Sequence, residues 1–64
     1  MQTNVSSFTK GQRVELHPGT DAWMRGDRFG VVVRVGQRHP HYVHVHMDRS
    51  GLVRRIPDWA LTAV

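Results

Sequence analysis

Apolar and polar residues alternate in several short runs of this chain, and this alternation limits its fold more than any other feature. Residues 42–47 read YVHVHM. Successive side chains of a β-strand point to opposite faces, so the run predicts a half-buried strand. Its valines and its methionine are expected to face the core. Its other face would carry Tyr42, His44 and His46 toward solvent.

Four further segments are predicted to be strands, because each is short and either β-branched or alternating, with glycine or proline nearby. They span residues 13–17, 29–35, 52–56 and 60–64. Within residues 29–35, an exposed Arg34 would place Val33 inside and Val32 outside. The predicted core residues are Val14, Leu16, Val33, Val43, Val45 and Leu61.

The connections between these strands carry turn signals. A long first loop, residues 18–28, is rich in turn formers, and its Asp27 is expected to pair with Arg28 or with the backbone. Residues 48–51 read DRSG and predict a hairpin loop in which Gly51 supplies a positive φ. Residues 57–59 predict one short helical turn before the last strand.

Together these elements predict an all-β fold, a five-stranded antiparallel barrel of residues 11–64 after a flexible N-terminal arm of residues 1–10. At sixty-four residues without a cysteine, the chain is one small domain that no disulfide stabilises. We therefore expect oligomerisation or tight closure of the barrel to supply the missing stability. No apolar run approaches the ~20 residues of a membrane span and no secretory signal opens the chain, so a cytoplasmic location is expected.

Arginine dominates the charge of the chain. Nine Lys and Arg residues against five Asp and Glu residues give a net charge of +4, and eight of the nine bases are arginine. Guanidinium groups stack on rings and bind phosphate in bidentate fashion, so the composition favours a polyanionic partner. Rings and guanidinium groups would alternate on the outer face, as single-stranded nucleic acid requires. The predicted nucleic-acid-binding residues are Arg13, Arg34, Tyr42, His44, His46, Arg54 and Arg55.

Four of the five histidines lie within residues 39–46, HPHYVHVH. On one strand face, His44 and His46 would lie about 7 Å apart, a spacing that lets two imidazoles share a zinc ion with His39 or His41. No paired carboxylate orients these rings, which favours a solvated strand face over a metal site. We therefore expect neither a metal nor a cofactor. The histidines are expected to gain positive charge below neutral pH.

The sequence contains no recognisable catalytic constellation. There is no cysteine, the serines lie in the arm and one hairpin loop, and the aspartates lie in turns. We therefore expect a binding protein and not an enzyme. One alternative is a protein-interaction module that uses Trp23, Met24 and Trp59. In the competing interpretation, Trp23 and Trp59 cover the two ends of the barrel core.

The order of the predicted elements resembles the SH3-like barrel, over residues 11–64. The segments that carry the resemblance read GQRV, GDRFGVVVRV and IPDWALTAV. SH3-like barrels include KOW and Tudor-type modules, many of which bind RNA, DNA or protein tails. The resemblance therefore implies a binding module with nucleic acid or protein as its partner.

The end of the chain also resembles plasmid-borne type II dihydrofolate reductases. The matching residues are Gly51, Val53, Pro57, Ala60 and Leu61, together with the turn GTDAW at residues 19–23. That resemblance implies a homotetramer around one pore, in which a Val-Gln-Ile-Tyr segment contacts cofactor and substrate. Here the segment reads VRRI at residues 53–56, so reductase activity is not expected. A reductase-like homo-oligomer is the alternative to the binding module.

Overall fold

The computed structural model describes residues 8–36 and 41–64, in which five short strands and two helical turns form the fold. The strands are β1 (Arg13–Leu16), β2 (Phe29–Val35), β3 (Tyr42–Met47), β4 (Val53–Pro57) and β5 (Leu61–Ala63), and the helical turns are α1 (Asp21–Met24) and η1 (Asp58–Ala60). This order confirms the predicted strand content and the helical turn before the last strand. Within those two ranges, no helix is long and apolar enough to cross a membrane.

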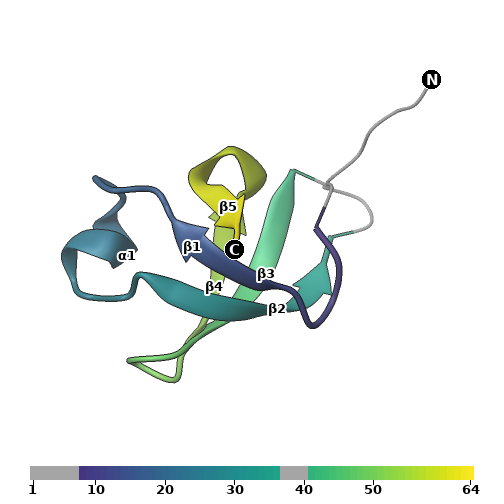
Figure 1. The fold of residues 1–64 in the computed structure, drawn as a ribbon, viewed down its shortest axis with the longest axis horizontal. Helices are drawn as coiled ribbons and strands as arrows, with labels where there is room; N and C mark the ends of the chain where they lie inside the picture. Colours follow the sequence, from purple (N-terminus) through teal and green to yellow (C-terminus); the bar gives the residue numbers. More distant parts are fainter. Residues whose placement is uncertain (1–7, 37–40) are drawn as a thin grey trace.

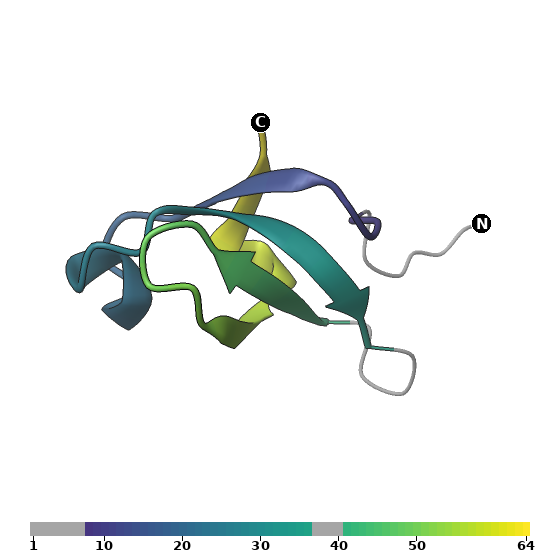
Figure 2. The same cartoon turned by 90° about the horizontal axis from the view of Figure 1, so that it is seen from below.

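All five strands form one antiparallel sheet in the order β4-β3-β2-β1-β5. The sheet curls strongly, so that one of its faces becomes the interior of the molecule (Figures 1 and 2). In the part of the chain that the structure describes, β4 and β5 are the two edges and do not pair with each other. The sheet is therefore not closed, and the predicted barrel is not confirmed. A small five-stranded antiparallel sheet of this kind is compatible with an SH3-like fold.

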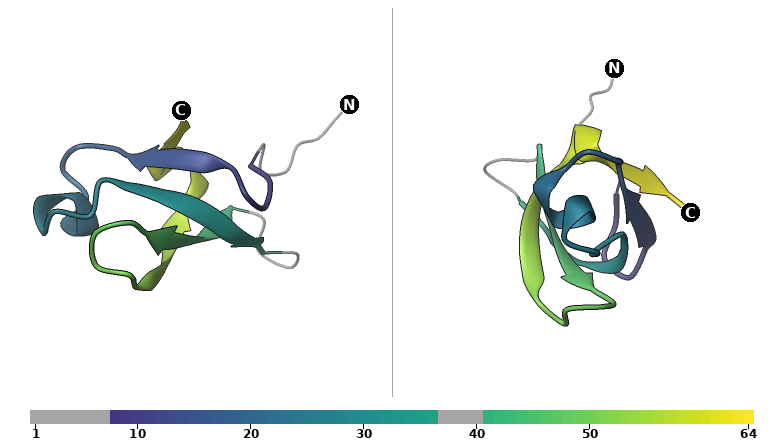
Figure 3. Two further views of the ribbon diagram at one scale, coloured as in Figure 1. Left: turned by 60° about the horizontal axis from the view of Figure 1, so that its bottom comes forward. Right: turned by 90° about the vertical axis from the view of Figure 1, so that its left-hand side faces the viewer.

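The long first connection contains the helix α1, where the sequence predicted only a loop. Thr20 caps this helix, because its Oγ1 accepts a hydrogen bond from the backbone N–H of Trp23 at 3.3 Å. Asp21 in the first turn adds a favourable interaction with the helix dipole. The chain leaves α1 through Gly26, whose φ of 103° suits glycine. The helix lies across one end of the curled sheet (Figure 3) and buries Ala22 there.

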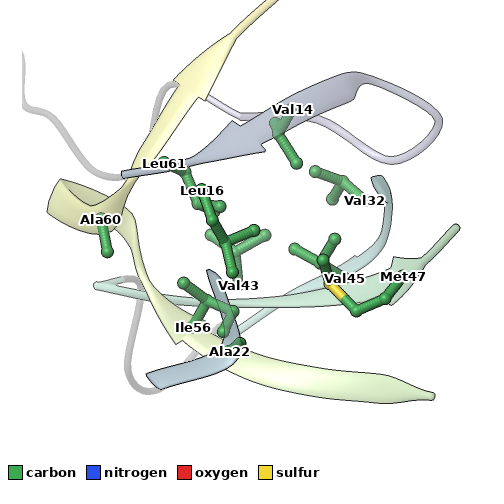
Figure 4. Close-up of a cluster of buried hydrophobic side chains, with 10 residues drawn as sticks. All are labelled: Val14, Leu16, Ala22, Val32, Val43, Val45, Met47, Ile56, Ala60 and Leu61. Carbon is green, nitrogen blue, oxygen red and sulfur yellow. The ribbon is translucent and has the colours of Figure 1, made fainter. Parts of the chain in front are cut away.

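The core consists of ten buried apolar side chains, which point toward one another from every strand and both helical turns (Figure 4). They are Val14, Leu16, Ala22, Val32, Val43, Val45, Met47, Ile56, Ala60 and Leu61. All the predicted core residues except Val33 are among them, so the predicted inward faces of β1, β3 and β5 are confirmed. The hairpin loop after β3 is confirmed as well, since Gly51 has a φ of 74°.

The predicted phase of β2 is wrong at Val33. Val32 is 1% exposed and Val33 is 37% exposed. The register between β2 and β3 shifts between Val32 and Arg34, so that Val33 is an extra residue in a β-bulge. The extra residue of a bulge breaks the alternation of inward and outward side chains along the strand. Counting back from the exposed Arg34 by strict alternation therefore places the preceding valines on the wrong face of the sheet. Gly30 faces inward like Val32, and it lets β2 approach β3 because a Cβ atom there would lie 2.6 Å from the carbonyl oxygen of His46.

The two tryptophans do not both cover the core. Trp23 is half-buried on α1 and packs against the core at that end of the sheet. Trp59 is 72% exposed, so its predicted role as a core plug is wrong. The reason lies in the geometry of η1, a tight turn in which neighbouring side chains point about 120° apart. Ala60 takes the inward position of this turn, and Trp59 projects outward.

The start of the described chain joins the sheet. Phe8 packs against the core with its side chain half-buried, and the N–H of Gly11 donates to the carbonyl of Val32 at 2.7 Å. Residues 1–7 of the predicted flexible arm lie outside the described residues. The predicted turn at residues 37–40, which includes His39, also lies outside them.

The bulge makes a prediction about stability. Val32→Ala should lower the free energy of unfolding by about 1–3 kcal/mol, because it removes two buried methyl groups from a close-packed core. Val33→Ala should change it by less than about 0.5 kcal/mol, since that side chain faces solvent. Urea unfolding of both variants would measure the difference. A larger loss for Val33→Ala would show that the strand has the opposite phase.

Candidate nucleic-acid interface

The outer face of β3 carries the ring side chains that the sequence placed there. Tyr42 and His46 are exposed, and His44 is half-buried. The three residues between and after them, Val43, Val45 and Met47, are all buried, as the alternation requires. The predicted outward position of the histidines is therefore confirmed.

Strand register brings three basic residues into one row across the middle of this face. His44 on β3 is paired with Arg34 on β2 and with Arg55 on β4. Cβ atoms of directly opposite residues in an antiparallel sheet lie about 4.5–5.5 Å apart. We call Arg34, His44 and Arg55 the basic row. Within residues 8–36 and 41–64 the ion pairs are Arg13–Asp48 and Arg54–Asp27, so no carboxylate holds the two arginines of the basic row.

Tyr42 adds an aromatic ring at one end of the basic row. The guanidinium carbon of Arg55 lies 4.2 Å from the centre of the Tyr42 ring, which is a cation–π contact. This contact orders both side chains on the outer face without using the hydrogen-bond donors of the guanidinium group. A planar guanidinium group and an aromatic ring are the two protein surfaces on which unpaired nucleic-acid bases stack.

Two of the predicted nucleic-acid-binding residues have other partners. The Nη1 atom of Arg13 donates to both carboxylate oxygens of Asp48, at 2.7 and 3.0 Å, in an ion pair that is about half exposed. Arg54 lies opposite the buried Val45, so its side chain leaves β4 on the inner face. The structure thus groups Arg34, Tyr42, His44 and Arg55, with His46 farther along β3. Arg13 lies on the same outer face, in a row with Val31 and His46, but is paired with Asp48, whereas Arg54 lies on the inner face.

Arg54 belongs to a hydrogen-bond network around Asp27, which is 2% exposed. Asp27 accepts hydrogen bonds from Nε of Arg54 at 2.9 Å, from Oγ of Ser50 at 2.8 Å and from the backbone N–H of Ser50 at 3.2 Å. Of the two predicted partners of Asp27, the backbone is confirmed by the Ser50 N–H, whereas Arg28 lies over the ring of Trp23 at 4.2 Å. The network joins the loop after α1, the β3–β4 hairpin loop and β4.

This network determines the charge state of Asp27. Burial by itself raises the pKa of the Asp27 carboxyl, because it removes the charged form from water. The hydrogen bonds from Ser50 and Arg54, together with the positive charge of Arg54, outweigh burial and leave the pKa of Asp27 below its usual value. Asp27 is therefore ionised at neutral pH and neutralises the arginine on the inner face of β4.

The histidines do not form a metal centre in the part of the chain that is described. No group of three or more His, Cys, Asp or Glu side chains there lies close enough to hold a metal ion. His39, one of the two candidate third ligands, is outside the described residues. His44 also stands between two guanidinium groups in the basic row, and their positive charge opposes a cation at that position.

A second surface feature, which sequence reasoning missed, is a groove of about 490 Å³ on the inner side of β4. Its apolar lining includes Ala22 of α1, Ile56 of β4 and Trp59 of η1. Of the predicted protein-binding residues, only Trp59 lines it, whereas Met24 is 71% exposed elsewhere on α1 and Trp23 lies beneath Arg28. No sequence pattern could have located the groove, because three distant segments meet to form it.

The lowered pKa of Asp27 predicts a pH-dependent effect on stability. The contribution of Asp27 is fully present above the unfolded-state pKa of about 3.9 and is lost as the pH falls through the lower folded-state pKa. Asp27→Asn should therefore lower the melting temperature at pH 7, and the difference from the native chain should shrink below about pH 4.

Asp48→Asn is the matched control, because it removes a carboxylate from a half-exposed ion pair and should cost less. Thermal melts followed by circular dichroism would compare the three proteins. Equal melting temperatures for Asp27→Asn and the native chain at pH 7 would contradict the assignment.

Comparisons with known proteins leave the family of this chain open. The chain matches no family model, no curated protein and no solved structure.

Proposed function

We propose that this chain is a small basic binding module of the SH3-like kind, and that it binds single-stranded nucleic acid on the outer face of its sheet without catalysing a reaction. The proposed interface consists of Arg34, Tyr42, His44, His46 and Arg55. Arg13 and Arg54 are left out, because carboxylates already hold their guanidinium groups.

The observation that carries the proposal is the basic row beside Tyr42. Strand register aligns the row across three neighbouring strands, and no carboxylate in the described ranges neutralises its arginines. The exposed guanidinium groups of Arg34 and Arg55, which have no carboxylate partner in the described chain, attract phosphates, and bound phosphates would relieve the repulsion between them. Charge alone would suit any polyanion.

The aromatic component favours nucleic acid over other polyanions. Tyr42 and the guanidinium group stacked on it offer planar surfaces next to the phosphate-binding groups. Stacking of a base on such a surface contributes about 1–3 kcal/mol and works for every base, because all bases have a π-face. The proposal therefore implies binding with weak sequence preference and a preference for single strands, whose bases are free to stack.

The resemblance to type II dihydrofolate reductases supports a different function, a reductase in a homo-oligomer. In this chain the corresponding segment of β4 directs Arg54 to Asp27, and Arg55 stacks on Tyr42. These contacts give both arginines structural partners within the chain. Reductase activity is therefore the competing outcome of the binding experiment.

Salt dependence tests the phosphate contacts. Binding of a fluorescein-labelled single-stranded oligonucleotide, followed by anisotropy, should weaken linearly on a log–log plot against salt concentration. Arg34→Ala should make that slope shallower by about 0.7, the value for one lost phosphate contact with a single strand. Tyr42→Ala should weaken binding by about 1–3 kcal/mol with little change of slope, since a stacked ring releases no counterion.

Arg25→Ala is the matched control, because it removes the same charge from an exposed residue at the C-terminal end of α1. Its slope and affinity should stay close to those of the native chain. The proposal fails if no oligonucleotide binds at low ionic strength. Oxidation of NADPH in the presence of dihydrofolate by the same preparation would instead support the reductase.

A further inference from the structure

The edge of the sheet at β4 carries backbone groups that face away from the rest of the sheet. Residues of an antiparallel pair alternate between those bonded to the neighbouring strand and those pointing away from it. The N–H of Met47 donates to the carbonyl of Leu52 at 2.8 Å, and the N–H of Asp58 donates to the carbonyl of His41 at 2.6 Å. Even-numbered residues of β4 therefore bond to β3, and Val53 and Arg55 direct their N–H and C=O groups to the open edge.

The inner side of this edge holds apolar side chains beside charged ones, because Asp21 and the Asp27-paired Arg54 also line the groove. The groove of about 490 Å³ runs along β4, with Ile56 and Ala60 at its base and Trp59 beside it. Trp59 is 72% exposed, which is a large apolar surface for a side chain next to unpaired backbone groups. An apolar side chain placed in the groove would cover Trp59 and Ile56 together.

The outer side of the same edge is basic. Arg55 ends the basic row at the open edge, and no described strand lies beyond it. A residue directly opposite Arg55 on an added strand would lie about 4.5–5.5 Å away at Cβ. An acidic side chain at that position would give a favourable cross-strand pair, and a basic one would repel Arg55.

We propose that the β4 edge binds an extended peptide, which adds to the sheet as a further strand and alternates acidic with apolar side chains. The backbone of the peptide bonds to Val53 and Arg55, its acidic side chains lie beside Arg55 on the outer face, and its apolar side chains enter the groove against Trp59. Pro57 lacks an N–H group and limits the paired stretch at that end. This peptide site goes beyond the proposed nucleic-acid interface.

A second copy of the chain fits this edge less well. Two-fold pairing centred on the middle of β4 would place Arg55 directly opposite the Arg55 of the partner subunit, and like charges in opposite positions are destabilising. A nucleic-acid strand has no alternating N–H and C=O groups to match Val53 and Arg55. An acidic peptide satisfies the backbone groups and the charge together.

The probe is a fluorescein-labelled octapeptide in which glutamate and valine alternate, titrated by anisotropy. A version with N-methyl groups on alternate amides keeps its charge but cannot donate to β4, and it should bind about tenfold or more weakly. Amide hydrogen exchange gives a direct signature. The N–H groups of Val53 and Arg55 should exchange rapidly in the free protein and slow down on binding, whereas those of Arg54 and Ile56 should be protected throughout.

Two protein variants test the groove and the charge. Trp59→Ala should weaken peptide binding about tenfold or more without changing oligonucleotide binding. Met24→Ala is its matched control, because Met24 is equally exposed but does not line the groove. Arg55→Glu should reverse the preference, so that the corresponding lysine–valine peptide binds more tightly than the glutamate–valine peptide. Thermal melts would confirm that each variant is folded.

Four results would overturn the peptide site. The first is that the glutamate–valine peptide does not bind, and the second is that its N-methylated version binds as tightly as the unmodified peptide. The third is peptide binding that leaves the amide hydrogen exchange of Val53 and Arg55 unchanged. The fourth is oligonucleotide binding that is lost in Trp59→Ala. The last result would assign the groove to nucleic acid. Loss of oligonucleotide binding alone would refute only the outer-face interface, since the peptide site shares Arg55 with that interface but also depends on the β4 backbone and on Trp59.

Discussion

One curled sheet has to enclose its own core, and the rest of the structure depends on this constraint. No second layer covers the sheet in the described chain, so the apolar core lies on its inner face, with the Arg54–Asp27 pair beside it. The outer face carries polar and charged groups together with the exposed Phe29 and Val53. In the curled sheet β2 lies close to β3 at Gly30, where a side chain would not fit. The bulge at Val33 breaks the alternation of faces within β2. Because the curl stops before β4 reaches β5, an edge and a groove remain open beside β4.

The buried carboxylate of Asp27 divides the arginines by role. Arg54 lies on the inner face of β4, where an unpaired charge would be costly, and Asp27 neutralises it there. Asp48 similarly forms an ion pair with Arg13 at the surface. Arg34 and Arg55 have no carboxylate partner in the described chain, and neither do Arg25, Arg28 and Arg49. What distinguishes the basic row is the strand register that aligns its side chains on one face beside Tyr42.

The two proposed surfaces meet at Arg55. Its guanidinium group belongs to the outer face, and its backbone belongs to the open edge of β4. A strand added at that edge would bring a carboxylate to the guanidinium group that a phosphate would otherwise contact. Arg34 and Trp59 lie on either side of this shared residue and each belongs to one of the proposed surfaces, so substitutions at these two positions would distinguish the two proposed activities.

The sequence by itself determined the strand class, the order of the elements, the hairpin glycine Gly51 and the outward histidines of β3, because alternation and turn chemistry act over a few neighbouring residues. Only tertiary structure decided four features: the face of Val33, the partner of Asp27, the exposure of Trp59 and the open edge at β4. Each depends on contacts between segments distant in sequence. Local periodicity carries no information about such contacts, and the grouping of Arg34, His44 and Arg55 likewise required the strand register that the curled sheet imposes.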